Sequence, residues 1–174
     1  GTAARDRAGG GMIQREHILQ KHLRHWVRDA VSADHVFLSF DSAGKATQNQ
    51  RARAAARGVA AGTPDTVLHT RGFPPLYAEL KAPGGKPSEA QTEMMTRLQI
   101  AGCIVEVVRS VHDYFSLLYL VRVPLGINAQ VMAQHYDLKI EAEIARAESR
   151  VGKSARTTKP APRYTVGKRV ASRA

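Results

Sequence analysis

Apolar residues recur along this chain with two different periods, and each period predicts a type of secondary structure. A spacing of three to four residues, as in Leu19, Leu23 and Trp26, predicts a helix, and alternation of apolar with polar residues predicts a strand. The predicted helices are residues 12–30, 47–57, 88–102, 110–120 and 128–149, and the predicted strands are residues 35–41, 66–70, 76–80 and 103–108. This order predicts an α/β sandwich, with a mixed central sheet flanked by helices.

The strands at residues 66–70 and 76–80 form a predicted hairpin, because Gly72 and two prolines between them are turn residues. A turn centred near Gly72 gives an antiparallel register that places Asp65 opposite Glu79. Directly opposed side chains lie about 4.5–5.5 Å apart at Cβ, so these two carboxylates repel each other. Side chains alternate between the two faces of a strand, so Lys81 lies on the same side as Glu79. The hairpin therefore brings two carboxylates and one ammonium group to one small patch.

This patch has two interpretations. As a surface ion cluster it contributes little to stability, because water and salt weaken exposed ion pairs. As a divalent-metal site it makes use of the opposed carboxylates, because the cation cancels their repulsion. The residue types and spacing of Asp65, Glu79 and Lys81 alone leave both interpretations open.

Three short motifs carry a resemblance to a known family. They are GTPD at residues 62–65, ELK at residues 79–81 and GKPSEAQ at residues 85–91. The first two resemble the PD-(D/E)xK nuclease signature. All three, in this order and spacing, resemble the VRR-NUC branch of that superfamily, which is found in small phage and bacterial proteins. The resemblance covers residues 13–118, and it implies a restriction-endonuclease-like sandwich and an endonuclease that hydrolyses phosphodiester bonds in DNA.

The resemblance also implies roles for individual residues. Mg²⁺ or Mn²⁺ would be held by Asp65, Glu79 and the backbone carbonyl of Leu80. The metal would acidify a bound water and stabilise charge on the scissile phosphate. Lys81 would orient that water or neutralise the phosphate, and Gln91 would position water or substrate. Relatives that cleave junctions imply a preference for branched DNA.

Glu16 and Gln91 each have a structural and a functional interpretation. Glu16 falls on the apolar stripe of the first helix, where it either sits at the edge of the stripe or, as the resemblance implies, joins the metal cluster. Gln91 forms an S-x-x-Q capping box with Ser88, which is a sufficient structural reason for a glutamine. The apolar stripe of the same helix also points Gln91 toward the sheet, and in the family this glutamine lines the active site. Both roles are compatible, because the capping bond engages only one end of the amide.

Four basic residues near the hairpin are candidates for contact with nucleic-acid phosphates. Arg51, Arg53 and Arg57 share the outer face of the predicted helix at residues 47–57, and Lys86 lies in the glycine loop that follows the hairpin. A solvated helix face explains the three arginines equally well.

The sequence does not favour a zinc site. Cys103 is the one cysteine, so a cysteine-based zinc site and an internal disulfide are excluded. His22 and His25 have a helical spacing that permits shared metal ligation, but no further ligands follow at motif spacing. We therefore interpret them as surface histidines.

The net charge of +11 is unevenly distributed, and this divides the chain. Residues 12–148 carry 16 basic and 14 acidic side chains, whereas residues 149–174 carry eight basic and no acidic ones. The expected parts are a disordered N-terminal segment (1–11), a nuclease core (12–126), a C-terminal helix (127–150) and a basic disordered tail (151–174). Such a tail is typical of a solvated arm with non-specific affinity for nucleic acid.

No apolar run approaches the length of a membrane span, so we expect no membrane partner and a cytoplasmic location, in a bacterial cell or a phage-infected host. The apolar stripe at residues 128–149 must be buried, either on its own domain or on a second subunit, and we expect a homodimer that cuts paired strands. Two other functions remain open: a non-catalytic DNA-binding module of the same fold, and a basic structural protein that binds nucleic acid through its tail.

Overall fold

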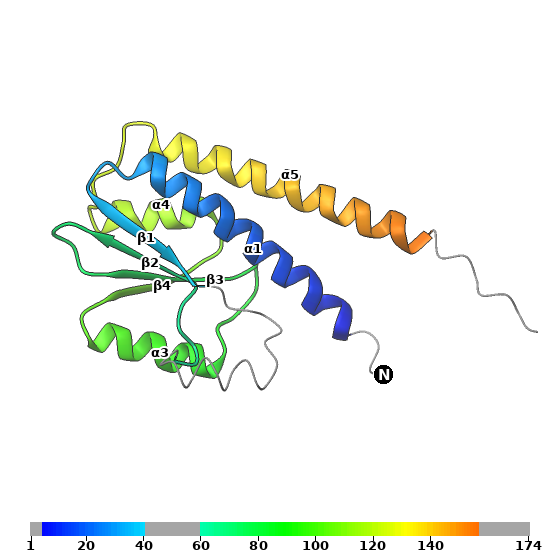
Figure 1. The fold of residues 1–174 in the computed structure, drawn as a ribbon, viewed down its shortest axis with the longest axis horizontal. Coiled ribbons are helices and arrows are strands. Elements are labelled where there is room, and N and C mark those ends of the chain that lie inside the picture. Colours follow the sequence, from blue (N-terminus) through cyan, green and yellow to red (C-terminus); the bar gives the residue numbers. More distant parts are fainter. Residues whose placement is uncertain (1–4, 41–59, 157–174) are drawn as a thin grey trace, which may run out of the picture.

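The computed structural model describes residues 5–40 and 60–156 (Figure 1). Its elements, in chain order, are α1 (Arg5–Ala30), β1 (His35–Ser39), β2 (Thr66–Thr70), β3 (Leu76–Leu80), α3 (Glu89–Ile100), β4 (Ile104–Val108), α4 (Val111–Leu120) and α5 (Ala129–Arg156). The described part of the chain is therefore an α/β fold of four strands and four helices. No helix within it is long and apolar enough to cross a membrane.

The ends of the chain differ from the sequence-based expectation. Helix α1 begins at Arg5, so most of the segment expected to be disordered, residues 1–11, continues the helix. Helix α5 likewise extends to Arg156, six residues into the expected tail. A helix can extend into polar segments at its ends, because each further residue adds a hydrogen bond to a helix that is already formed and packed in its middle. The predicted helix at residues 47–57 and the tail from residue 157 lie outside the described residues.

The four strands form one mixed sheet in the order β1-β2-β3-β4. The pairs β1–β2 and β2–β3 are antiparallel, and β3–β4 is parallel. In the hairpin, Thr66 pairs with Ala78, and Leu68 with Leu76. This confirms the predicted register, which brings Asp65 and Glu79 next to each other at the end of the hairpin.

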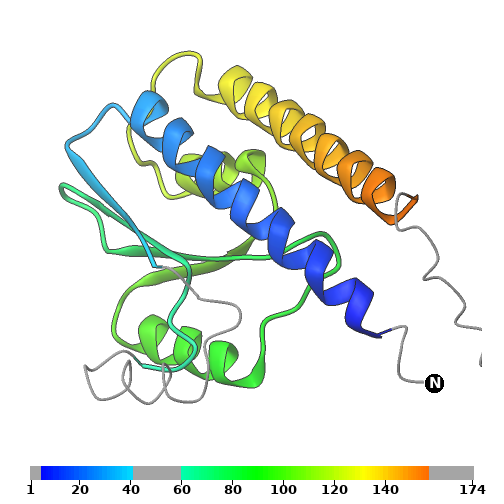
Figure 2. The ribbon, with the colours of Figure 1, turned by 45° about the vertical axis from the view of Figure 1, so that its right-hand side comes forward.

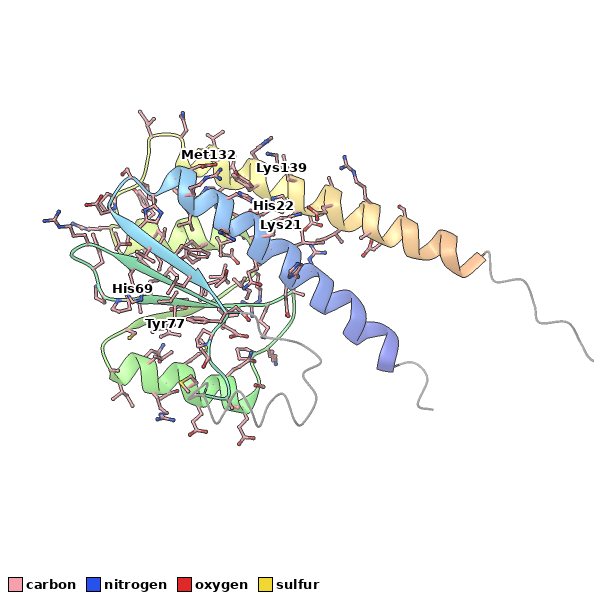
Figure 3. All side chains as sticks on the ribbon, in the orientation of Figure 1. Lys21, His22, His69, Tyr77, Met132 and Lys139 are labelled. Carbon is pink, nitrogen blue, oxygen red and sulfur yellow. The ribbon has the colours of Figure 1, made fainter. Side chains whose placement is uncertain are left out.

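The helices cover the two faces of the sheet unequally (Figures 1 and 2). α1 and α4 pack on one face, with the buried stripe of α1 that includes Leu19, Leu23 and Trp26 against the sheet. α3 lies alone among the described helices on the other face, where Tyr77 of β3 points (Figure 3). β4 is an edge strand of the described sheet; Val105 and Val108, which point to opposite faces, are buried, whereas Glu106 is exposed.

The long helix α5 runs antiparallel beside α1 and also contacts α4 (Figures 1 and 2). Its predicted stripe is covered by these helices: Ile140 and Ile144 are buried, and Met132 and Tyr136 pack against the core. The Nε1 of Trp26 donates a hydrogen bond to the carbonyl of Ala129, at 3.1 Å. The expectation that a second subunit covers this stripe is therefore wrong, and the homodimer loses one of the two observations that motivated it.

This packing predicts the effect of truncating Ile140, whose exposed fraction is 5%. Ile140→Ala is expected to lower the free energy of unfolding by about 2–4 kcal/mol, because it leaves a cavity between α5 and the core. Leu138→Ala is the matched control, since Leu138 on the same helix is 71% exposed, and its change should stay within about 0.5 kcal/mol. Urea denaturation measures both. A dimer interface would instead make the effect of Ile140→Ala depend on protein concentration.

Candidate active site

Asp65 directly precedes β2 and is fixed by contacts from α1, from β3 and from the residue after β1. Its Oδ2 accepts a hydrogen bond from the backbone N–H of Leu80 at 2.8 Å, across the hairpin. Its carbonyl accepts the N–H of Phe40 at 2.7 Å and the Nε2 of Gln20, from α1, at 3.4 Å. The carboxylate of Asp65 is thereby held at the end of the hairpin, beside Glu79.

Glu79 is fully buried, and its two carboxyl oxygens have different surroundings. Oε1 accepts hydrogen bonds from the Nζ of Lys81, at 2.6 Å, and from the Nε2 of Gln91. Oε2 is buried and accepts no hydrogen bond from the described residues. A buried carboxylate oxygen without a donor costs free energy, so this atom marks a place for a cation or a proton.

The electrostatics of Glu79 support this interpretation. Burial, followed by the neighbouring charge of Asp65, raises the pKa of Glu79 to about 7, although Lys81 acts in the opposite direction. Glu16 contributes in the same direction as Asp65. The three carboxyl groups together carry more negative charge than Lys81 alone balances.

Glu16 reaches the cluster from α1, as the sequence resemblance implies. It is half-buried, and its Oε1 faces the backbone N–H of Ala82 at 3.4 Å, directly after β3. The alternative, in which Glu16 lies at the edge of the apolar stripe, also holds, because its neighbours Ile18 and Leu19 are buried and Glu16 is not. A position at the edge of the stripe is what allows the carboxylate to point toward the end of β3.

Gln91 uses both ends of its side-chain amide. Its Oε1 accepts the backbone N–H of Ser88 at 2.8 Å, and its own N–H donates to the Oγ of Ser88 at 3.3 Å, which completes the predicted capping box. Its Nε2 donates to Glu79. The start of α3 is thereby tied to the buried carboxylate, so the structural and functional interpretations of Gln91 both fit the geometry.

Gly62 places the loop before Asp65 against the start of α3. Its φ is +79°, and a Cβ built on it would lie 2.1 Å from the carbonyl oxygen of Ala90. No other residue type fits this close approach without movement. The glycine therefore sets the distance between the Asp65 loop and the helix that carries Gln91.

Gly62→Ala is accordingly expected to displace the Asp65 loop from α3, with a loss of about 1–3 kcal/mol of stability from overpacking added to the strain of a positive φ. Gly102→Ala is the matched control, because Gly102 has a φ of +86° but nothing within 4 Å of its would-be Cβ. Thermal unfolding should show the larger loss for Gly62→Ala. Equal losses would mean that the contact with Ala90 is unimportant.

The predicted phosphate-binding residues are only partly described. Lys86 is exposed in the loop after β3, whereas Arg51, Arg53 and Arg57 lie outside the described residues. Sequence reasoning missed Arg109, whose Nη2 donates to the carbonyl of Gly85 at 3.1 Å. The sequence could have indicated Arg109, because it directly follows β4, and parallel neighbours such as β3 and β4 end at the same edge of a sheet.

The donor set fits a hard divalent cation. Within the described ranges, no group of three or more His, Cys, Asp or Glu side chains is placed to hold a metal ion. Mg²⁺, however, needs only one or two carboxylates, with water and substrate phosphate completing its shell. Asp65 and the bare Oε2 of Glu79 meet that need, and Glu16 lies near enough to affect the pKa of Glu79. The carbonyl of Leu80 remains a predicted ligand.

The histidines of α1 point in different directions. His22 faces α5 beside Lys21 (Figure 3), and its Nε2 lies 3.0 Å from the Oε2 of Glu143. His25 is exposed and lines a different surface. The interpretation as a surface histidine is therefore confirmed for His25, whereas His22 is half-buried against α5.

Comparison of the chain with protein-family models, with curated proteins and with solved structures gave no match.

Proposed function

We propose that this chain is a Mg²⁺- or Mn²⁺-dependent endonuclease that hydrolyses phosphodiester bonds in DNA, with a PD-(D/E)xK sandwich of the VRR-NUC type. One observation carries the proposal: the antiparallel register sets Asp65 beside a buried Glu79 whose Oε2 has no donor among the described residues. Such a pair is unfavourable by itself and favourable around a divalent cation. The order of GTPD, ELK and GKPSEAQ along the chain supports the same proposal.

Each residue of the cluster has a role in this mechanism. Asp65 and Glu79 hold the metal, with the carbonyl of Leu80 and Glu16 as further oxygen donors. The bound metal supplies Lewis-acid charge and lowers the pKa of water. Gln91 keeps Glu79 in position through its Nε2.

Lys81 is the residue that contacts the scissile phosphate. Its Nζ lies 2.6 Å from Oε1 of Glu79, and its side chain retains an exposed fraction of 12%, so part of the side chain is open to solvent. There it orients the attacking water or stabilises the negative charge that develops on the phosphoryl oxygens.

The preference for branched DNA rests on the family resemblance alone. A test combines labelled duplex, single-stranded and four-way-junction DNA, each with Mg²⁺, Mn²⁺ or EDTA. The proposal predicts cleavage with either metal, none in EDTA, and the fastest cleavage on the junction. Binding without any cleavage under all conditions favours the non-catalytic DNA-binding module instead. The basic structural protein predicts that removal of residues 157–174 abolishes all binding.

The cleavage products of this experiment also test the homodimer, which remains a prediction. One site cuts one strand per event, so two-fold related subunits give paired cuts at symmetric positions. A monomer gives nicks. Since α1 and α4 cover the stripe of α5, a dimer requires some other surface.

A further inference from the structure

A basic groove runs between α1 and β1, which is an edge strand of the described sheet. Two adjoining hollows of about 360 Å³ and 440 Å³ form it, and they share Arg24 and His25 in their walls. The cationic and imidazole side chains that line the groove are His17, Lys21, Arg24, His25, Arg28 and His35. No Asp or Glu is among the described residues of its walls.

One end of this groove adjoins the candidate active site. Gln20 and Ser39 line the first hollow, and the Nε2 of Gln20 donates to the carbonyl of Asp65. Ser39 pairs with Thr66, the residue after Asp65, whereas His35 pairs with Thr70 at the other end of β1. The groove therefore leads away from Asp65 along the whole edge strand.

The positive charge of the groove is only partly neutralised. The Nζ of Lys21 binds Glu143 at 2.6 Å, and Arg28 binds Asp29 at 2.7 Å. Arg24 forms no ion pair among the described residues. From His17 to Arg28 the helix rises about 17 Å, which matches about five nucleotides at a rise of 3.4 Å per strand.

We propose that this groove binds the sugar-phosphate backbone of the strand that enters the Asp65–Glu79 site, an inference that rests on the proposed nuclease function. A line of cations over this length fits a chain of phosphates better than a single anion. Side chains of this type contact phosphates more often than base edges, so the contact positions the strand without reading its sequence. The groove thus binds the substrate strand on the side of the active site that lies opposite to α3.

The test measures binding rather than cleavage, with the full chain in EDTA and a fluorescein-labelled single-stranded oligonucleotide. Fluorescence anisotropy over a salt series gives the slope of log affinity against log salt. Arg24→Gln is expected to reduce that slope by about 0.7, the value for one phosphate contact on a single strand. Arg24→Glu should weaken binding by about tenfold at 0.1 M salt, because it also adds repulsion.

Arg97→Gln is the matched control, because Arg97 is an exposed helical arginine on α3, across the sheet from the groove. Its salt slope should equal that of the unmodified chain, and unchanged melting temperatures show that all variants fold. An oligonucleotide with abasic sites should compete as well as the intact strand.

Two results would overturn the proposal: an unchanged slope for Arg24→Gln in a folded chain, or equal competition by polyglutamate, which would make the groove a general polyanion surface. Absence of metal-dependent cleavage, in contrast, would overturn the nuclease function while the groove result stands.

Discussion

Glu79→Gln is expected to abolish metal-dependent cleavage while it stabilises the metal-free chain. The substitution keeps the size of the side chain but removes the buried charge that would hold the cation. Its effect on cleavage is measured with junction DNA and Mg²⁺, where we expect a loss of more than about 10³-fold, since no other fully buried carboxylate of the described residues can take its place.

The stabilisation has a pH dependence with a defined sign. Burial and Asp65 raise the pKa of Glu79 from 4.5 to about 7, so between these pH values the folded state keeps a proton that the unfolded state has lost. The contribution of Glu79 to stability is therefore full below pH 4.5 and is lost as the pH rises to about 7. The loss is on the order of 3 kcal/mol as an upper limit, at 1.36 kcal/mol for each pKa unit.

Chemical denaturation of the unmodified chain and of Glu79→Gln at several pH values isolates this contribution. The difference in stability between the two should grow in favour of Glu79→Gln from pH 5 to pH 8. Mg²⁺ at pH 8 should stabilise the unmodified chain and leave Glu79→Gln unaffected. Glu106→Gln is the matched control, because Glu106 lies on the adjacent strand and is exposed. A difference that stays constant with pH would show that Glu79 is not buried with a raised pKa.

Lys81→Met is expected to slow cleavage by at least about 10²-fold and to leave metal binding intact. The ammonium group acts on charge that develops in the transition state, so its loss should lower kcat more than it weakens binding of the substrate. The methionine keeps most of the apolar stem. Single-turnover cleavage at saturating Mg²⁺ measures the chemical step directly.

The same variant has a second, independent readout. Lys81 lowers the pKa of Glu79 through a hydrogen bond and its charge, so Lys81→Met should raise that pKa further and move the pH dependence of metal binding upward. Lys139→Met is the control, since Lys139 is exposed on α5 and stacks over the ring of Tyr136. Cleavage by Lys81→Met at the rate of the unmodified chain would remove Lys81 from the mechanism.

The local features of the site were predictable from sequence because short-range rules determine them. The turn at Gly72, whose φ is +83°, fixes the hairpin register, and this register brings Asp65 next to Glu79. The capping box of Ser88 and Gln91 is likewise a contact between residues three positions apart. Such features need no knowledge of the rest of the fold.

The features that sequence reasoning missed depend on contacts between distant segments. The apolar stripe of α5 predicted that this face is buried, but periodicity alone does not indicate which surface covers it. In the structure α1 and α4 cover it. Arg109 reaches the loop after β3 only because β4 lies parallel to β3. The basic groove likewise exists only because α1 packs beside β1.

Calorimetric titration with Mn²⁺ at pH 8 measures whether Asp65 and Glu79 together hold a divalent cation. Asp65→Asn is the comparison, because asparagine can still accept the hydrogen bond from the N–H of Leu80 and so keeps the hairpin in place. We expect saturable Mn²⁺ binding to the unmodified chain and at least a tenfold weaker affinity for Asp65→Asn. Equal affinity of the two folded proteins for Mn²⁺ would show that Asp65 does not hold the cation.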